Sequence, residues 1–390
     1  MRFEAIWCIT NIAAGDTYHT QVVAECEAVP TLISLLSRGT DRIREQAAWA
    51  LGNIAGDSEM MRDYVIECGV VEPLKKLIQT SGQVPLLRNA SWAVTNLCRG
   101  NKPPPAPAAV RPFLATLLKL LHSGDDEIVI NGCWCAVFLS IGSTDNIQQV
   151  IETGACAKLV ELLLHDKWAV VTPALRALGN IVTGNDIQTQ VCTHAHAFMC
   201  THVLIYCARA VKKECLWVLS NILAGTDAQI QAVIDANLIQ LVLDSLEHGE
   251  FRVQREAAWA LCNALASGAD DQIRFMVSQG CIPPLCAMLK KHDAKLVGVV
   301  LQGLYSILTV GKRPAGEQND FHDAIEQCGG LETLMLLAVD ENENISRRSR
   351  LLLEKFLQPM HDAMVELDPD FDGHMYSVDQ MHVTPSNYHV

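Results

Sequence analysis

The chain has 390 residues, of which 49% are hydrophobic, and its 30 basic and 44 acidic side chains give a net charge of −14. This hydrophobic fraction excludes a disordered chain, and the acidic balance argues against non-specific nucleic-acid binding. Charged residues or glycines interrupt every apolar stretch well before the ~18–20 residues that span a membrane, and residues 1–4 do not begin a secretory signal. The 15 cysteines are spread singly, which favours reduced thiols in a protein of the cytoplasm or nucleus.

A tryptophan followed four residues later by an asparagine recurs along the chain. The pairs are Trp7 and Asn11, Trp49 and Asn53, Trp92 and Asn96, Trp217 and Asn221, and Trp259 and Asn263. Two intermediate copies keep the frame as Trp134 with Phe138 and Arg176 with Asn180, an eighth falls at 303–308, and a fading ninth falls at 351–357. Successive copies lie 41 to 43 residues apart, so the chain is built from an internal repeat.

Each period contains three helical segments. In one period, residues 42–55 place apolar side chains at helical spacing, Gly56 to Ser58 break the helix, and residues 59–68 and 71–80 form two shorter helices. A helical repeat of this length is typical of the armadillo and HEAT classes. We therefore predict an all-α, right-handed superhelical armadillo-repeat solenoid of about nine repeats with three helices each. It occupies residues 1–358, starts within a repeat, and is followed by a disordered tail over 359–390.

The tryptophan and asparagine of each pair share one face of a helix. Neighbouring residues such as Leu51 and Ile54 already supply a core stripe, so we expect both members of the pair to face outward as a ladder. Asparagine can clamp a peptide unit, and tryptophan rings form slots for the aliphatic stems of lysine and arginine. Asp57, Glu214 and Glu256 lie where they can pair with the charged heads. The pattern predicts a groove for an extended, Lys/Arg-rich peptide.

These residues resemble importin-α, the adaptor for nuclear localisation signals. The resemblance runs from about Arg2 to Leu357 and includes the ladder and the segments Trp49-Ala-Leu-Gly-Asn-Ile-Ala-Gly-Asp57, Asn96-Leu-Cys-Arg-Gly-Asn-Lys-Pro-Pro-Pro105 and Gly179-Asn-Ile-Val-Thr-Gly184. It implies an adaptor of nuclear import that shuttles between cytoplasm and nucleus. Proteins with basic localisation signals would be its partners, and an export receptor would bind the C-terminal repeats, where the acidic residues near 340–343 are candidates for the contact.

The resemblance also implies two peptide sites. The major site would contain Trp7, Asn11, Gly15, Thr20, Gln46, Trp49, Asn53, Asp57, Trp92, Asn96 and Arg99. The minor site would contain Arg176, Asn180, Val182, Thr183, Glu214, Trp217, Asn221, Glu256, Trp259 and Asn263. In this assignment Gly15, Thr20 and Asp57 hold the key lysine, and Arg176 pairs with nearby acids and interrupts the groove between the sites.

Three features depart from the family pattern. The chain begins inside a repeat and lacks the basic importin-β-binding segment, so importin-β recruitment and autoinhibition are not expected. Asn131 stands where the family has an aspartate in the groove, which should weaken affinity for residues beyond the major-site core. Residues 191–209 replace a glycine-containing turn and an amphipathic helix with a Cys/His-rich stretch.

Other functional classes fit the sequence less well. Cys192, His194, His196, Cys200 and His202 do not have the spacing of a zinc site, and we expect neither a metal nor a cofactor. The carboxylates follow the repeat rather than one pocket, so an enzyme is not expected. A scaffold of the catenin kind remains the alternative, with a groove for acidic partners. So does a form that binds cargo but cannot recruit importin-β. The proline segment 102–107 is interpreted as a rigid loop between repeats or a ligand for a partner.

Overall fold

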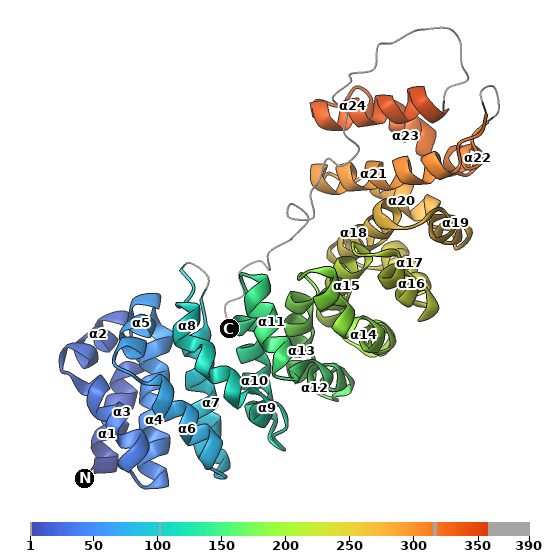
Figure 1. The fold of residues 1–390 in the computed structure, drawn as a ribbon. Helices are drawn as coiled ribbons and strands as arrows, with labels where there is room; N and C mark the ends of the chain where they lie inside the picture. Colours follow the sequence, from blue (N-terminus) through green and yellow to red (C-terminus); the bar gives the residue numbers. More distant parts are fainter. Residues whose placement is uncertain (1, 101–102, 315–317, 358–390) are drawn as a thin grey trace. The chain divides into compact units, whose positions relative to one another are not determined.

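The computed structural model describes residues 2–100, 103–314 and 318–357, and every regular element within these ranges is a helix (Figure 1). The chain divides into two compact units, residues 1–199 and 200–390. None of the described helices is both long enough and apolar enough to cross a membrane. The all-α prediction is therefore confirmed for the described part of the chain.

The first unit holds the helices before residue 200. They are α1 (Arg2–Ala13), α2 (Thr17–Glu25), α3 (Ala28–Arg38), α4 (Asp41–Asp57), α5 (Glu59–Glu67), α6 (Val71–Thr80), α7 (Val84–Cys98), α8 (Pro107–Val110), η1 (Arg111–Phe113), α9 (Leu114–Leu121), α10 (Asp126–Leu139), α11 (Thr144–Glu152), α12 (Ala155–Glu161), η2 (Leu162–Leu164) and α13 (Trp168–Ile181). Helix α14 (Asp186–Tyr206) runs across the boundary between the units.

The second unit continues the pattern. Its helices are α15 (Arg209–Leu223), α16 (Asp227–Asp235), α17 (Leu238–His248), α18 (Phe251–Ser267), α19 (Asp270–Ser278), α20 (Ile282–Met288), α21 (Ala294–Val310), α22 (His322–Gln327), α23 (Gly330–Leu337), α24 (Glu343–Leu352) and the π-helical turn η3 (Leu353–Leu357). The predicted ninth copy at 351–357 thus forms the end of α24 and η3.

Most repeats consist of a short helix, a second helix and a longer third helix, as in α2, α3 and α4. A residue with positive φ turns the chain between the first two helices, because a left-handed residue ends a helix sharply. Glycine fills this position at 69, 154, 280 and 329, whereas Glu27 and Asn237 adopt it at φ values of 54° and 56°. The turn explains why one glycine recurs in each of four repeats.

The stretch 191–209 lacks this turn. No glycine or asparagine occurs between Asp186 and Arg209, and the structure forms one continuous helix, α14, where other repeats have two. In the structure, the predicted departure from the family pattern is therefore one long helix in place of two shorter ones. The side chains of Cys192, His194 and His196 lie outside the described residues, as does the predicted tail over 359–390.

The third helices stack side by side and position the predicted ladder. In the first unit α1, α4, α7, α10 and α13 contact one another in that order, and in the second unit α15, α18, α21 and α24 do the same. Aliphatic side chains that are almost fully buried, such as Leu51, Ile54 and Leu97, fill the space behind this row. Each repeat therefore buries its apolar face against its neighbours, as expected of a solenoid.

Candidate peptide-binding groove

The ladder tryptophans become less exposed along the chain. Trp7 and Trp49 have exposed fractions of 48% and 42%, Trp92 and Trp217 are half-buried, and Trp259 is only 8% exposed. The prediction that every ring faces solvent is therefore confirmed for the first two rungs and wrong for Trp259. The first two rungs offer the indole surface that a lysine or arginine stem could cover.

The ladder asparagines connect neighbouring repeats. In four of them the side-chain Nδ2 donates to a backbone carbonyl of the preceding third helix. The donor and acceptor residues are Asn53 and Thr10, Asn96 and Gly52, and Asn180 and Val137, each at 3.0 Å, and Asn263 and Ser220 at 2.9 Å. Asn11 is exposed and Asn53 half-buried, but Asn96 and Asn263 are 6% and 5% exposed. The prediction that these two asparagines face outward is wrong, because the carbonyls supply the buried partners that the sequence did not reveal.

An asparagine amide that bridges two repeats still has polar atoms with which it can bind a ligand. Asparagine has two N–H donors and one carbonyl acceptor, and at Asn53, Asn96 and Asn263 the bond between repeats uses a single donor. At Asn263 the carbonyl oxygen is buried and has no hydrogen-bond partner among the described residues. Such unpaired polar atoms are uncommon inside proteins and call for an explanation. A bound peptide amide is a suitable donor for this oxygen.

Two glycines of α4 make room for the next rung. A Cβ atom at Gly52 would lie 2.5 Å from Cζ3 of Trp92, and one at Gly56 would lie 2.9 Å from Nδ2 of Asn96. The helix α4 continues through Gly56 and ends at Asp57, so the break predicted at Gly56 is wrong. Sequence reasoning missed both glycines as part of the site. Their spacing of four residues within one helix, where glycine is unfavourable, was the available signal.

Asp57 carries an unpaired negative charge at the edge of the row. It is the last residue of α4, where the helix dipole is negative and a carboxylate is unfavourable. Its Oδ2 atom is buried and has no hydrogen-bond partner among the described residues. A lysine ammonium placed here would supply the donor that this oxygen lacks. Its positive charge would also offset both the negative charge of the carboxylate and the negative end of the helix dipole.

Two other predicted major-site residues are turned inward. Thr20 is fully buried, and its hydroxyl donates to the carbonyls of Ala13 and Asp16, each at 3.4 Å. Gln46 is 5% exposed, and its Nε2 donates to Oγ1 of Thr10 at 2.8 Å. Both residues thus make hydrogen bonds within the protein, whereas Gly15 is exposed.

Arg99 is held in place by a buried arginine that the sequence analysis did not single out. Arg62 is 1% exposed, and its Nη1 donates to the carbonyls of Arg99 at 2.9 Å and Pro103 at 3.2 Å. The same guanidinium pairs with the neighbouring carboxylate of Asp63 at 2.8 Å. Gly100 has a φ of 115°, and a Cβ atom there would lie 2.4 Å from Arg62 Nη1. Arg62 thus fixes the loop that follows the Trp92 rung.

The ladder changes character at the fourth copy. Trp134 and Phe138 stack with ring centroids 5.9 Å apart, and the Arg176 guanidinium lies 5.6 Å from the Trp134 ring centroid. Arg176 is 8% exposed and lies over the Trp134 ring, and the interruption of the groove and the pairing with acids that the sequence assigns to it both stay predictions. Asn131 donates through Nδ2 to Oγ of Ser91 at 3.0 Å and therefore joins two repeats.

The second unit holds two buried carboxylates beside its ladder. Glu214 and Glu256 are 7% and 6% exposed. Burial raises the pKa of Glu256 above its ordinary value, although Lys213 and Arg255 act in the opposite direction. Nε1 of Trp259 and Nδ2 of Asn221 are buried without hydrogen-bond partners among the described residues. The polar atoms left unpaired in the described chain thus include several of the predicted minor site.

The predicted minor site is divided between the two units. Asn180, Val182 and Thr183 belong to the first unit, and the residues from Glu214 to Asn263 belong to the second. Asn180 is half-buried, Val182 is buried, and Thr183 donates its hydroxyl to the Asn180 carbonyl at 2.7 Å. The assignment of these three residues to a peptide site stays a prediction.

One group of side chains within the described residues has the composition of a metal site. His322, Asp323 and Glu326 place one ligand atom each within 4.8 Å of one another. Both carboxylates are exposed, and Nδ1 of His322 already contacts the Gln318 amide and the Asp323 carboxylate. The cluster lies on the short helix α22 and shares no residue with the ladder.

Comparison with known proteins identifies the family. The armadillo/β-catenin-like repeat family model matches residues 16–56, 58–99, 143–183 and 226–266, and an atypical armadillo repeat model matches residues 319–370. Importin subunit alpha-1b of Oryza sativa subsp. japonica is 42% identical over 395 residues, which cover all of this chain and 74% of that protein. The chain belongs to the importin-α family. Importin subunit alpha-4 of Arabidopsis thaliana is 41% identical over 96% of this chain and 70% of its own length.

Solved structures agree with the armadillo fold. The crystal structure of an engineered protein superposes with a TM-score of 0.81 at 27% identity, covering 90% of this chain and 84% of the other. A designed armadillo repeat protein has a TM-score of 0.51 at 22% identity, covering 72% of this chain and 99% of the other, and shows the fold alone. The armadillo solenoid and the importin-α resemblance are therefore both confirmed.

Proposed function

We propose that the row of third helices binds a Lys/Arg-rich nuclear localisation signal in an extended conformation, and that the chain acts as a cargo adaptor between cytoplasm and nucleus. Membership of the importin-α family supports the adaptor role. The groove itself is supported by one observation above the others. Asp57 places an unpaired carboxylate oxygen at the negative end of α4, on the helix that carries the exposed Trp49 ring.

The chemistry of the first unit fits a basic peptide. The Trp7 and Trp49 rings present apolar faces, which attract cations and cover aliphatic stems. Asn11 and Asn53 offer side-chain amides to the peptide backbone, a contact that does not depend on sequence. Asp57 supplies the charge that selects lysine. In the second unit, Glu214 and Glu256 would play the same part for a second basic cluster.

The test is a titration of a fluorescent Lys-rich peptide and of its copy with the key lysine replaced by threonine, at physiological salt. We expect the threonine copy to lose most of the affinity. Asp57→Asn should weaken binding of the lysine peptide by about 10- to 150-fold, since a hydrogen bond to a charged group contributes roughly 1.5–3 kcal/mol.

Asp41→Asn is the matched control because Asp41 lies at the opposite end of α4 and is exposed. Its affinity should equal that of the wild type. Equal affinity of the wild type for both peptides would reject the groove. Equal loss in the two variants would mean that general charge, not the Asp57 slot, attracts the peptide. Titration of an acidic peptide tests the alternative, a groove that prefers acidic partners, and we expect this peptide not to bind.

A further inference from the structure

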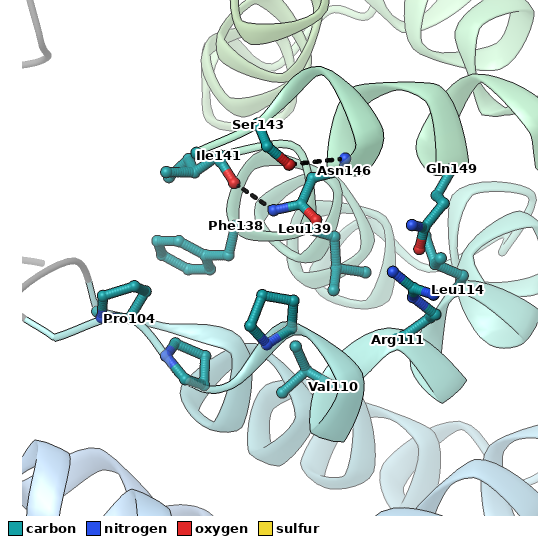
Figure 2. A pocket seen from close by; sticks show the side chains of 14 residues that line it. Pro104, Val110, Arg111, Leu114, Phe138, Leu139, Ile141, Ser143, Asn146 and Gln149 are labelled. Atoms are coloured by element: carbon teal, nitrogen blue, oxygen red, sulfur yellow. Dashed lines mark hydrogen bonds between the residues drawn. The ribbon is translucent and has the colours of Figure 1, made fainter.

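A pocket of about 220 Å³ lies beside the fourth rung, entirely within the first unit (Figure 2). One side is formed by the proline loop and the start of α8 and α9, and the other by the end of α10 and the turn into α11. Its lining is mostly apolar and includes Pro104, Pro105, Val110, Leu114, Phe138 and Leu139. Small-molecule sites usually enclose ~300–1,000 Å³, so this volume suits a single large side chain.

Partly buried hydrogen bonds hold both sides of the pocket. The Arg62 guanidinium donates to the carbonyls of Arg99 and Pro103 and so fixes the start of the loop. On the other side, Asn146 Nδ2 donates to the Ile141 carbonyl at 2.7 Å, as Figure 2 shows. A cavity held open in this way binds with little loss of conformational entropy. The proline loop is therefore anchored beside the pocket at the carbonyls of Arg99 and Pro103.

The pocket continues the ladder. Phe138 stands four residues after Trp134, at the position that asparagine occupies in the earlier rungs, and its ring belongs to the lining. Helix α10, which carries it, is tied to α7 by the bond from Thr95 Oγ1 to the Asn131 carbonyl at 3.1 Å. A peptide that follows the rungs of Asn53 and Asn96 would next meet Phe138. At that rung an apolar surface takes the place of the asparagine amide that would hold the peptide backbone.

The polar groups at this pocket do not suit a lysine or arginine. Among the described residues that line it, the only charged side chain is Arg111, which pairs with Asp145 at 3.1 Å and would repel a second cation. Gln149 donates to the same Asp145 carboxylate at 2.7 Å. The carboxylate is thus engaged by two partners, and an apolar side chain gains most from the remaining surface.

We propose that this pocket is a specificity subsite that takes one large apolar side chain of the bound peptide, of leucine or phenylalanine size. The proposal rests on the proposed function, because it places the peptide along the same row of helices. Neighbouring helices lie 8–10 Å apart and an extended chain advances about 3.3 Å per residue. The apolar residue should therefore lie about three residues beyond the one held at the Asn96 rung.

A positional scan tests the subsite. A Lys-rich core peptide is flanked on either side by five alanines, and leucine replaces each alanine in turn. We expect one flanking position at which leucine strengthens binding by about 5- to 50-fold, measured by fluorescence anisotropy, and no comparable effect at the others. Lysine at that position should bind no better than alanine.

Two variants then locate the effect. Leu114→Trp fills the pocket, and Phe138→Ala removes the one aromatic ring among the described lining residues, so the leucine-to-alanine ratio should fall toward 1 in each. Leu118→Trp is the matched control, because Leu118 lies one turn further along α9, is 40% exposed and does not line the pocket. It should keep the wild-type ratio, and thermal melting monitors folding of all three proteins.

The possible outcomes separate the two proposals. If the core peptide binds but no flanking position prefers leucine, or if the preference survives in both Leu114→Trp and Phe138→Ala, the subsite is rejected and the groove stands. If the core peptide itself does not bind to folded protein, the groove assignment is rejected and the subsite with it.

Discussion

Replacing Asn96 by alanine should weaken the coupling between two neighbouring repeats. The Asn96 side chain is 6% exposed, and its Nδ2 donates to the Gly52 carbonyl of α4 at 3.0 Å. The variant loses one buried hydrogen bond and leaves that carbonyl without its second donor in the interior. We expect the free energy of unfolding to fall by about 1–3 kcal/mol, the range for removing one partner of a buried pair.

Asn11→Ala is the matched change at an exposed rung. Asn11 occupies the same position of the repeat on α1, but its side chain is exposed to solvent. Its replacement should alter the unfolding free energy by no more than about 0.5 kcal/mol, as at other surface positions. It should nevertheless weaken peptide binding if the ladder clamps the peptide backbone. The two asparagines thus separate the structural use of the ladder from its use in binding.

The assay is urea unfolding followed by circular dichroism, together with peptide titration of each folded variant. Repeat proteins unfold repeat by repeat to varying degrees, so the midpoint and the slope of the transition are both compared. A wild-type midpoint for Asn96→Ala would refute the bridging role of the amide. Equal shifts for Asn96→Ala and Asn11→Ala would show that exposure does not separate the two positions.

Two further predictions concern packing and pH. Gly52→Ala should lower the unfolding free energy by about 1–3 kcal/mol, because the new Cβ atom would lie 2.5 Å from the Trp92 ring. Gly124 has open space around it, so Gly124→Ala should not destabilise the protein by overpacking. Urea unfolding compares the two variants. Because burial raises the pKa of Glu256, the native state binds a proton more readily than the unfolded state above pH 4.5, so this residue's contribution to stability falls as pH rises through the raised value. Cation binding by the second unit should strengthen over the same interval, and Glu256→Gln should remove both dependences in pH-resolved unfolding and titration; a wild-type pH profile for that variant would contradict the assignment.

The sequence was sufficient to predict the fold because the repeat period and the helical spacing of apolar residues are properties of the chain itself. Helices predicted at 59–68 and 71–80 appear as α5 and α6 within a residue at each end. The turn between the first and second helices could also be anticipated from the recurrent glycines at 69, 154, 280 and 329. No such glycine occurs in 186–209, and this stretch forms the single helix α14.

The orientation of the ladder could be predicted only in part. A helical pattern tells which face of a helix is apolar, but it does not tell how closely the next helix approaches. At Asn96 and Asn263 the neighbouring helix is near enough for a carbonyl to accept from the amide, and the side chain is buried. Gly52 and Gly56, which permit that approach, were visible in the sequence but acquire meaning only once the partner side chains are located.

The same amide can hold the solenoid together and still bind a ligand, because the two tasks use different atoms. One Nδ2 hydrogen goes to the preceding helix and fixes the plane of the amide, which leaves the second hydrogen and the oxygen oriented before a peptide arrives. An amide oriented in advance loses less entropy on binding than a freely rotating one. In the proposed groove, the bond from Asn53 to the Thr10 carbonyl would therefore favour recognition as well as stability. The ladder that a single sequence suggests as a binding surface is, in the structure, also the joint between its repeats.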